Sequence, residues 1–363
     1  MDFIDLKTQY LKFKPSIREA IDRVLEHGRF IMGPEIDTLE STLAAYVGCR
    51  HAITVASGTD SLEIALRALE IGPGDEVVTV PFTWISTAEV IAQVGAKPVF
   101  VDIDPLDFNI AVEQIEAAIT PATKALLPVS LFGQMPDYGA IHAIAAKHGL
   151  TVIEDAAQSF GATRHGVRSC NATRIASTSF YPAKPLGCYG EGGALFTNDD
   201  DLAVKMKAIR THGGIRRHYH DLVGMNGRFD TLQAAIMLAK WPGFEAEVAA
   251  RNRLGARYSE KLCDVCETPA IREGNTHVYA QYTIRVPDRD TLAEKLKALG
   301  IPTAVYYPKC LHEQPVFAPL GYNYGDFPEA ESASREVISL PLNPYLSERE
   351  QDLVIAGVRL ALG

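Results

Sequence analysis

One lysine stands in a stretch that neither a helix nor a strand can accommodate. The stretch Ser177–Gly193 reads STSFYPAKPLGCYGEGG, and its prolines and glycines break regular structure on both sides of Lys184. On a stiff, partly apolar turn, desolvation disfavours the ammonium form, and a neutral amine is what a Schiff-base nucleophile requires. The alternative is a surface loop whose lysine simply faces water.

A second stretch carries groups that bind an anion. In HAITVASGTDSLEIALRALE, residues 52–55 are predicted as a strand and 61–69 as a helix, with Ser57–Asp60 as the turn between them. A Ser-Gly-Thr turn at the start of a helix presents backbone N–H groups and hydroxyls to a phosphate. A helix that these residues merely cap needs no ligand, so both interpretations stay open.

Two polar residues and one aromatic residue follow other predicted strands. Asp155 comes after an apolar strand in TVIEDAAQSFGA, where a carboxylate is costly unless it meets a cation or hydrogen-bond donors. Gln158 lies on the same side if a helical turn begins there. Trp84 follows an earlier strand, in PFTWISTAE. The alternatives are a plain helix N-cap for Asp155 and packing at the sheet edge for Trp84.

These candidates need a scaffold that gathers strand ends, and the order of elements predicts one. Strands are expected over 76–80, 98–101, 125–129, 151–154 and 176–180, alternating with helices over 85–94, 112–119 and 138–148. Alternation of this kind predicts an α/β fold with a mainly parallel sheet covered by helices on both faces. Ligands bind beyond the carboxyl ends of such strands, and all the candidates above follow strands.

The remaining elements suggest two domains. Further helices are expected over 14–27, 35–47, 200–211, 231–240 and 244–262. We predict a large domain over residues 1–245, with an N-terminal lead-in, and a small C-terminal α+β domain over 246–363 that closes over the main sheet. In the small domain, strands over 279–285 and 303–306 flank a helix over 290–299 like a βαβ unit, before helices over 330–337 and 348–362.

Composition disfavours several classes of function. The 363 residues carry a net charge of −10 without a long Lys/Arg run, so nucleic-acid binding is not expected. No signal peptide is recognisable, and no apolar run approaches the ~20 residues that span a bilayer. Scattered cysteines suggest a reducing compartment, and neither Cys263-x-x-Cys266 nor the His218–His220 loop reads as a metal site. We therefore expect a cytoplasmic protein without membrane contact or a metal.

The candidates together match the needs of one cofactor. Pyridoxal 5′-phosphate (PLP) requires an anion cradle, a stacking face, an acid at its pyridine nitrogen and an amine. The segments SGTDSLEIAL, PFTWISTAE, IEDAAQSFGA, SFYPAKPLGCYGEGG and NGRFDTLQAA, in this order, resemble the DegT/DnrJ/StrS family of PLP-dependent sugar aminotransferases. The resemblance covers nearly the whole chain. It implies the aspartate-aminotransferase-like fold (fold type I), with a seven-stranded sheet sandwiched by helices.

The resemblance also implies chemical roles for three residues. Lys184 would carry the cofactor as a Schiff base and shuttle protons, and Asp155 would pair with the pyridinium nitrogen. Gln158 would contact the phenolic oxygen of the ring. A lysine at position 184 also separates aminotransfer from the family's dehydratase branch, which has histidine there.

Cofactor and substrate contacts follow from the same resemblance. The phosphate and ring would be held by Gly58, Thr59, Ser179 and Trp84. Asn226 looks like the residue that the family sends across a dimer interface to the partner's phosphate, with Arg228 close to the substrate. A homodimer with a shared active site is therefore expected.

The chain most resembles the subgroup that aminates the 3-keto group of a UDP-linked N-acetyl-hexosuronic acid. L-Glutamate would be the amino donor and 2-oxoglutarate its product. Charge-assisted bonds from Arg216, Arg217 and His218 would suit the diphosphate and the carboxylate, although solvated loop charges are the alternative.

Aromatic residues are the other expected substrate contacts. These are Trp84, Tyr306 and Tyr307. The subgroup has a His-Tyr pair before a proline where this chain reads Tyr306-Tyr307-Pro308. A phenol replaces the imidazole there, and it can still donate a hydrogen bond to a sugar oxygen.

Three other functions compete with this interpretation. One is amination of a dTDP-linked 3- or 4-keto-6-deoxy sugar. Another is a catalytically silent PLP-fold subunit with a regulatory or binding role, against which the intact Lys184, Asp155 and Gln158 argue. A nucleotide oxidoreductase is suggested only by GCYGEGG, which lacks the strand–GxGxxG–helix context of dinucleotide sites.

Overall fold

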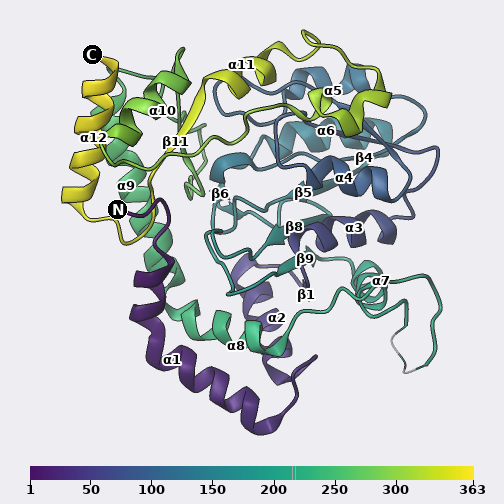
Figure 1. Cartoon of the computed structure of the whole chain (residues 1–363). Coiled ribbons are helices and arrows are strands. Elements are labelled where there is room, and N and C mark those ends of the chain that lie inside the picture. The colour runs from purple at the N-terminus through teal and green to yellow at the C-terminus, as the bar shows by residue number, and fades with distance from the viewer. Residues whose placement is uncertain (215, 217) are drawn as a thin grey trace.

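A seven-stranded sheet forms the centre of the large part of the molecule (Figure 1). The computed structural model describes residues 1–214, 216 and 218–363. The strands lie in the order β1 (His51–Val55), β9 (Gly193–Thr197), β8 (Ile175–Ser179), β5 (Thr151–Asp155), β4 (Thr123–Leu126), β2 (Glu76–Thr79) and β3 (Lys97–Phe100). Only β9 runs antiparallel to its neighbours. The predicted α/β fold with a mainly parallel, seven-stranded sheet is confirmed.

Helices cover both faces of this sheet because its strands are apolar on both faces. In β5, Val152 packs into one buried cluster and Ile153 into the other, as expected when side chains alternate along a strand. The first cluster includes α2 (Pro34–Val47), α5 (Val112–Ala118), α6 (Tyr138–His148) and α8 (Thr231–Lys240). The second includes α3 (Gly58–Ala68), α4 (Ser86–Gln93) and α7 (Asp200–Arg210).

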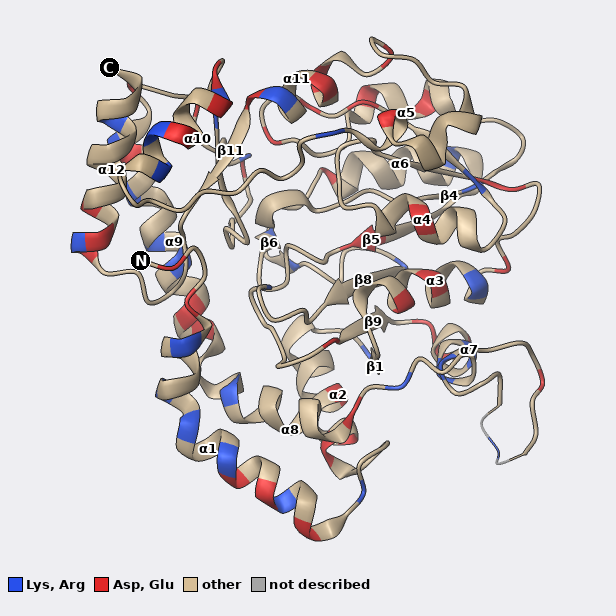
Figure 2. Cartoon of the chain, viewed as in Figure 1, with Lys and Arg blue, Asp and Glu red and all other residues tan. Residues whose placement is uncertain are grey.

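The N-terminal lead-in is one long helix, α1 (Leu6–His27), which packs along α8. It begins eight residues earlier than the helix predicted from residue 14, so that prediction was too short. Asp5 caps it by accepting a hydrogen bond from the backbone N–H of Thr8 (2.8 Å), and Pro15 lies inside it. Figure 2 shows basic positions along the first half of α1 and a mixture of acidic and basic positions along its second half.

The C-terminal part has its own small sheet and helices. Its elements are α9 (Phe244–Leu262), β10 (Tyr282–Arg285), α10 (Arg289–Ala298), α11 (Pro328–Glu336), β11 (Val337–Leu340) and α12 (Glu348–Leu362). Most of them share a buried cluster, but Phe317, Phe327 and Ala330 pack into the first cluster of the large sheet. The domain boundary after residue 245 stays a prediction.

The βαβ arrangement expected in the small domain is wrong. β10 pairs with β11 in antiparallel fashion, with Thr283 opposite Ser339. The segment predicted as a strand over 303–306 makes only an isolated antiparallel bridge, from Ala304 to Ser339. Pro302 and Pro308 flank this segment, and proline cannot donate to a strand ladder, so the pairing stays short.

Short elements complete the chain. A hairpin is formed by β6 (Thr163–Arg164) and β7 (Val167–Arg168), and 3₁₀ turns span Leu131–Gly133, Trp241–Gly243, Leu311–Glu313 and Pro315–Leu320. Within residues 1–214, 216 and 218–363, no helix combines the length and the apolar character that crossing a bilayer requires.

Candidate active site

The Lys184 turn joins the ends of β8 and β9 and is closed by its own backbone. The N–H of Lys184 donates to the carbonyl of Tyr181 (2.9 Å), and the N–H of Cys188 donates to the carbonyl of Phe180 (2.7 Å). Gly187 packs so tightly that an added Cβ would lie 2.5 Å from the carbonyl oxygen of Pro182. The lysine therefore projects from a compact turn whose backbone has little freedom.

The Lys184 side chain is poised near its neutral form. Burial lowers the pKa of its ammonium group to about 8, and the negative charge of Asp155 partly opposes this shift. At pH 7 about a tenth of the amine is then unprotonated, far more than for an ordinary lysine, which suits a nucleophile or a general base. Asp155 was predicted at the end of a neighbouring strand, and in the structure its carboxylate lies close enough to act on the Lys184 ammonium group.

Asp155 ends β5 and is buried at the floor of the site. Its Oδ2 accepts a hydrogen bond from the hydroxyl of Thr87 (2.9 Å), and its Oδ1 accepts one from the N–H of Ala157 (3.1 Å). Burial raises the pKa of the carboxyl group, while these donors and the Lys184 ammonium oppose the rise. A carboxylate in this state is suited to pair with a cationic ring nitrogen. Thr87, on the first turn of α4, was not predicted.

Gln158 is held in one orientation by two hydrogen bonds. Its Oε1 accepts from the N–H of Phe132 (2.7 Å), and its Nε2 donates to the hydroxyl of Tyr307 (3.0 Å). One amide hydrogen of Nε2 remains for a further acceptor. Phe132 has a φ of 56°, unusual for a residue other than glycine, and sequence analysis gave no signal for its role.

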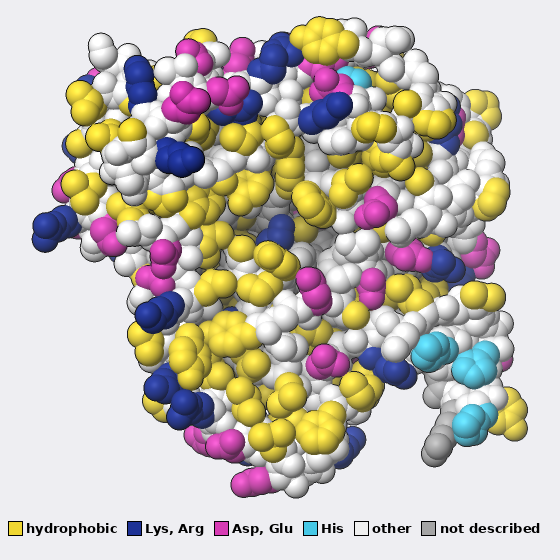
Figure 3. Space-filling view, viewed as in Figure 1, with side chains coloured by type: hydrophobic (Ala, Val, Ile, Leu, Met, Phe, Trp, Pro, Cys, Tyr) yellow, Lys and Arg dark blue, Asp and Glu magenta, His cyan; other side chains and the backbone are white. Residues whose placement is uncertain are grey.

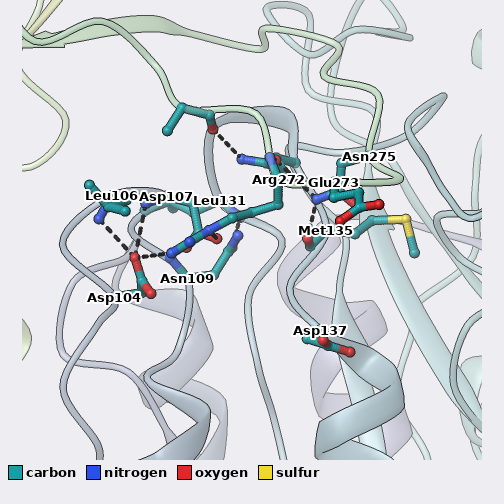
Figure 4. A network of polar contacts seen from close by, with 12 residues as sticks. Asp104, Leu106, Asp107, Asn109, Leu131, Met135, Asp137, Arg272, Glu273 and Asn275 are labelled. Carbon is teal, nitrogen blue, oxygen red and sulfur yellow. Dashed lines mark hydrogen bonds and ion pairs between the residues drawn. The ribbon is translucent and has the colours of Figure 1, made fainter.

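The loop that carries Phe132 is hydrogen-bonded to the segment that connects α9 and β10. Figure 4 shows Arg272 beside Asp104 and Asp107, and the Arg272 Nε donates to Asp107 Oδ2 (2.8 Å). The Oε1 of Gln134 accepts from the N–H of Arg272 (2.7 Å) and from Nδ2 of Asn275 (3.0 Å). These contacts fix the loop, and through it the orientation of the Gln158 amide.

The predicted phosphate turn lies against the end of β8. Ser57 caps α3 by accepting a hydrogen bond from the N–H of Asp60 (3.0 Å). A Cβ added to Gly58 would lie 2.7 Å from Cβ of Ser179, so the helix start and Ser179 are in close contact. The hydroxyl of Thr59 bonds to that of Ser86 at the start of α4 (2.8 Å). The starts of α3 and α4 thus meet beside the hydroxyls of Thr59 and Ser179. Together they form a cradle of the kind that binds an anion.

Aromatic side chains form a wall beside these groups. The Trp84 side chain is exposed, and its ring centroid lies 6.2 Å from that of Tyr307. Burial raises the pKa of the Tyr307 phenol, which keeps its proton available for donation. Tyr306 lies next to it and within 6.4 Å of the Phe3 ring. In Figure 3 this face of the molecule is hollowed near its middle and rimmed by hydrophobic side chains.

Asn226 and Arg228 flank the strand end that leads into the cradle, where the N–H of Ala56 donates to the carbonyl of Gly227 (3.0 Å) and Val55 pairs with Arg228. Asn226 and Arg228 line a hollow of about 340 Å³ together with Ile31, Gly190 and Glu191, among other residues. Among the described residues, no hydrogen bond joins Asn226 to the Gly58–Ser179 cradle, and the Nε of Arg228 is buried without a partner. The two residues therefore lie next to the cradle of their own chain, without a side-chain hydrogen bond to it among the described residues.

The basic loop stands apart from the cradle. Arg216 lies close to the ring of Tyr219, and His218 lines a separate surface hollow of about 350 Å³ with Lys207 and His220. Arg217, the other arginine predicted to meet an anion, lies outside the described residues. Whether this loop meets a substrate stays a prediction.

The residues that do meet fit pyridoxal phosphate. They supply an amine at Lys184, a buried carboxylate at Asp155, an oriented amide donor at Gln158 and an anion cradle at Gly58 and Ser179. This donor set matches the aldehyde, ring nitrogen, phenolic oxygen and phosphate of the cofactor. Trp84 supplies an exposed aromatic face beside them.

Comparison with known proteins agrees with this set. Residues 12–359 match the model of the DegT/DnrJ/EryC1/StrS aminotransferase family. The chain is 51% identical over 359 residues to a Pseudomonas aeruginosa protein named UDP-2-acetamido-2-deoxy-3-oxo-D-glucuronate aminotransferase, covering 99% of each.

A second relative and a solved structure extend the comparison. A Geobacillus stearothermophilus protein named pleiotropic regulatory protein is 49% identical, over 98% of this chain and 96% of the relative. The crystal structure of ntda from Bacillus subtilis with bound cofactor PMP superposes with a TM-score of 0.93 at 31% identity. It covers 100% of this chain and 85% of that one.

Proposed function

The chain belongs to the DegT/DnrJ/EryC1/StrS aminotransferase family of PLP-dependent enzymes, and we propose that it aminates a UDP-linked sugar. The acceptor is the 3-keto group of a UDP-linked N-acetyl-hexosuronic acid, and L-glutamate is the donor. The 51% identity to a relative named for such a substrate supports this choice. The observation that carries the reaction type is Lys184, with a lowered pKa, facing the buried Asp155 beside the oriented Gln158.

PLP, when bound, supplies an aldehyde that exchanges amino groups and a ring that accepts electrons. In the proposed site, Lys184 would bind the aldehyde, Asp155 would pair with the ring nitrogen and Gln158 would donate to the phenolic oxygen. The Gly58 and Thr59 backbone and the hydroxyls of Thr59 and Ser179 would hold the phosphate, and Trp84 would cover the ring.

The proposed proton transfers centre on Lys184. Its neutral amine removes the Cα proton of glutamate, and in the second half-reaction its ammonium returns a proton to C3 of the sugar. A pKa near 8 allows both directions at neutral pH, because neither protonation state is strongly disfavoured. In both half-reactions the buried carboxylate of Asp155 would stabilise a positive charge on the ring nitrogen.

We also propose that two copies of the chain share each site. Asn226 is exposed and lines a hollow outside the cradle of its own chain, beside Ile31, whose side chain is 51% exposed. Phe30, next to Ile31, is 47% exposed. A second copy that covers this apolar edge would place Asn226 and Arg228 at its neighbour's cofactor phosphate and substrate.

One relative's name favours a regulatory role instead. A silent subunit has no need of a lysine with a lowered pKa opposite a buried carboxylate. The catalytic groups therefore favour an enzyme. Amination of a dTDP-linked 3- or 4-keto-6-deoxy sugar uses the same groups and differs only in what the substrate contacts accept.

A coupled assay tests the proposal. Wild-type holoenzyme, glutamate and UDP-linked 3-keto-hexuronic acid should yield 2-oxoglutarate and a sugar product of the mass expected for amination. Lys184→Ala should lose at least about 10³-fold in turnover, because nucleophile and proton carrier are lost together. Borohydride should fix the cofactor to the wild type but not to the variant.

Each failure has a distinct meaning. Normal turnover by Lys184→Ala would overturn the mechanism. Activity only with dTDP-linked keto-sugars would overturn the substrate while leaving the mechanism intact. A protein that binds PLP but does not bleach on adding glutamate would point to the regulatory role.

A further inference from the structure

Lys240 is a buried ammonium group that the proposed chemistry does not use. It is the last residue of α8, and only 3% of it is exposed. A buried lysine is costly unless donors and acceptors compensate for lost water. Its Nζ donates to the carbonyl of Gly187 and to Oε1 of Gln9 (3.3 Å), and it lies 4.6 Å from the centroid of the Tyr189 ring.

The carbonyl that Lys240 binds belongs to the Lys184 turn. Gly187 is three residues after Lys184, in the part of the turn that packs against Pro182. Gly187 has no side chain, so its carbonyl is the group through which α8 can hold this point of the turn. An ammonium donor makes a stronger hydrogen bond to such a carbonyl than a neutral donor does.

A second side chain of α8 holds the next part of the same turn. Oε1 of Gln233 accepts from the N–H of Tyr189 (2.8 Å), and its Nε2 donates to the Tyr189 carbonyl (3.2 Å). Gln233 and Lys240 are seven residues apart, two helical turns, and therefore share one face of α8. Three backbone groups just after Lys184 are thus fixed to one rigid helix.

The positive charge of Lys240 is balanced by the carboxylate of Glu247, with Gln9 between the two groups. Nε2 of Gln9 donates to Oε2 of Glu247 (3.0 Å), and Oε1 of Glu247 accepts from the hydroxyl of Tyr345. Glu247 is 5% exposed. Glu247 is therefore linked to Lys240 through Gln9, whereas the carbonyl of Gly187 accepts a hydrogen bond from the Lys240 ammonium directly.

We propose that Lys240 is a positioning residue for the Lys184 amine. Its ammonium, together with Gln233, holds the backbone of Gly187–Tyr189 and so sets the direction in which Lys184 enters the site. The proposal rests on the proposed function, because Lys184 needs a fixed direction only if it moves protons between defined carbon atoms.

The test compares two holoenzyme variants that cut the same buried network at opposite ends. Lys240→Met removes the donor to Gly187 and keeps the length of the side chain. Tyr345→Phe, the matched control, removes the donor to Glu247 and leaves Gly187 bound. Measurements are kcat and KM for glutamate, the pH midpoint of the bound-cofactor absorbance, and hydrogen exchange at the amides of Cys188 and Tyr189.

The two variants should differ in a defined way. Lys240→Met should lower kcat by about 10-fold or more with KM within about twofold, because a displaced amine costs the transition state more than binding. It should also shift the absorbance midpoint and speed exchange at both amides. Tyr345→Phe should leave all four readouts near wild type. Lys240→Arg, which keeps a cationic donor, should recover part of the turnover.

The outcomes separate the two proposals. A wild-type absorbance midpoint, exchange rate and kcat in Lys240→Met would overturn the positioning role, as would equal changes in both variants. If Lys240→Met does not fold, Gln233→Met removes the neighbouring contacts without burying an unpaired charge, and the same readouts decide. If the wild type fails to transaminate, the proposed function falls, while absorbance and exchange still report on the turn.

Discussion

Two neighbouring carboxyl groups on β5 show how alternation along a strand separates the functions of similar residues. Asp155 points toward Thr87 and the cradle, whereas Glu154 points to the other face of the sheet, as alternation along a strand requires. Glu154 is fully buried, and its carboxylate accepts from the hydroxyls of Ser130 (2.9 Å) and Ser169 (2.8 Å) and the N–H of Cys170 (2.9 Å). Glu154 therefore serves the scaffold, and Asp155 serves the site.

Glu154 should make stability depend on pH. Burial raises the pKa of Glu154 from 4.5 to about 7. Between these values the native state binds more protons than the unfolded state, so this group stabilises the fold below pH 4.5 and loses that effect as pH rises through 7. Relative to Glu154→Gln, which cannot ionise, the wild type should lose about 2–3 kcal/mol of unfolding free energy between pH 5 and 8.

Urea unfolding of both proteins at several pH values checks this. Glu113→Gln, on the exposed side of α5, is the control and should show almost no pH-dependent difference from the wild type. A constant difference between Glu154→Gln and the wild type from pH 5 to 8 would contradict the prediction.

Strand ends were enough to predict that candidate residues gather at one edge of the sheet, while their chemical roles stay predictions. Asp155 ends β5, Gln158 follows β5 and Lys184 follows β8, so a parallel sheet brings the three to the same edge. Thr87 was missed because its contact depends on where the first turn of α4 lies over the end of β5. Phe132 was missed because it acts through its backbone N–H, which any residue supplies.

At the scale of elements, the entry into α3 is packed too closely against β8 to accept a larger residue. Gly58→Ala would bring a methyl group to 2.7 Å from Cβ of Ser179, and neither partner is the flexible end of a side chain. The helix start must move away from β8, and overpacking of this kind costs about 1–3 kcal/mol. In the proposed function the cradle holds the phosphate, so PLP affinity should fall by about 10-fold or more.

Equilibrium titration of PLP measures this loss. Gly72→Ala is the matched control: its Cβ would lie at an ordinary 3.7 Å from the carbonyl oxygen of Val94, in the loop that precedes β2. That loop is at the opposite edge of the sheet from the cradle, so its PLP affinity should be unchanged. An unchanged affinity in Gly58→Ala would show that the cradle lies elsewhere.

Three elements could not be read from the sequence. All five residues of β9 are buried, so no alternation marks it, and its first residue is a glycine of the turn before it. The direction of β9 depends on the Lys184 turn folding back on β8. Likewise, Ala304 pairs with Ser339 because of tertiary packing, and α1 includes Pro15, a residue that usually ends a helix.

At the scale of the whole molecule, the groups expected at one cofactor are not all joined within one chain. Lys184 and the Gly58–Ser179 cradle lie at the end of β8 and the start of α3, whereas Asn226 and Arg228 line a neighbouring hollow that opens beside the exposed Ile31. Sequence alone could not reveal this separation, since the resemblance, and not spacing, suggested a partner chain. A shared site predicts that two defective copies can repair each other.

The repair can be measured by mixing two variants. Lys184→Ala lacks the amine but keeps Asn226, and Asn226→Asp keeps the amine but places a negative charge toward the partner's phosphate. Each variant alone should be nearly inactive. In a mixed dimer one site combines the native Lys184 of one copy with the native Asn226 of the other, whereas the second site carries both defects.

Equal amounts of the two variants, coexpressed or unfolded and refolded together, should therefore recover about a quarter of wild-type activity. Half of the dimers are then mixed, and each has one intact site of two.

Pairing Lys184→Ala with Asp155→Ala is the control, because both residues belong to the same chain's half of the site. In that mixture each site keeps one of the two defects, so no activity should return even when the copies associate. Recovery in the control would show that the gain does not depend on residues supplied by two different copies. No recovery in the Asn226→Asp mixture, with both parents inactive, would place Lys184 and Asn226 at the same site of one chain.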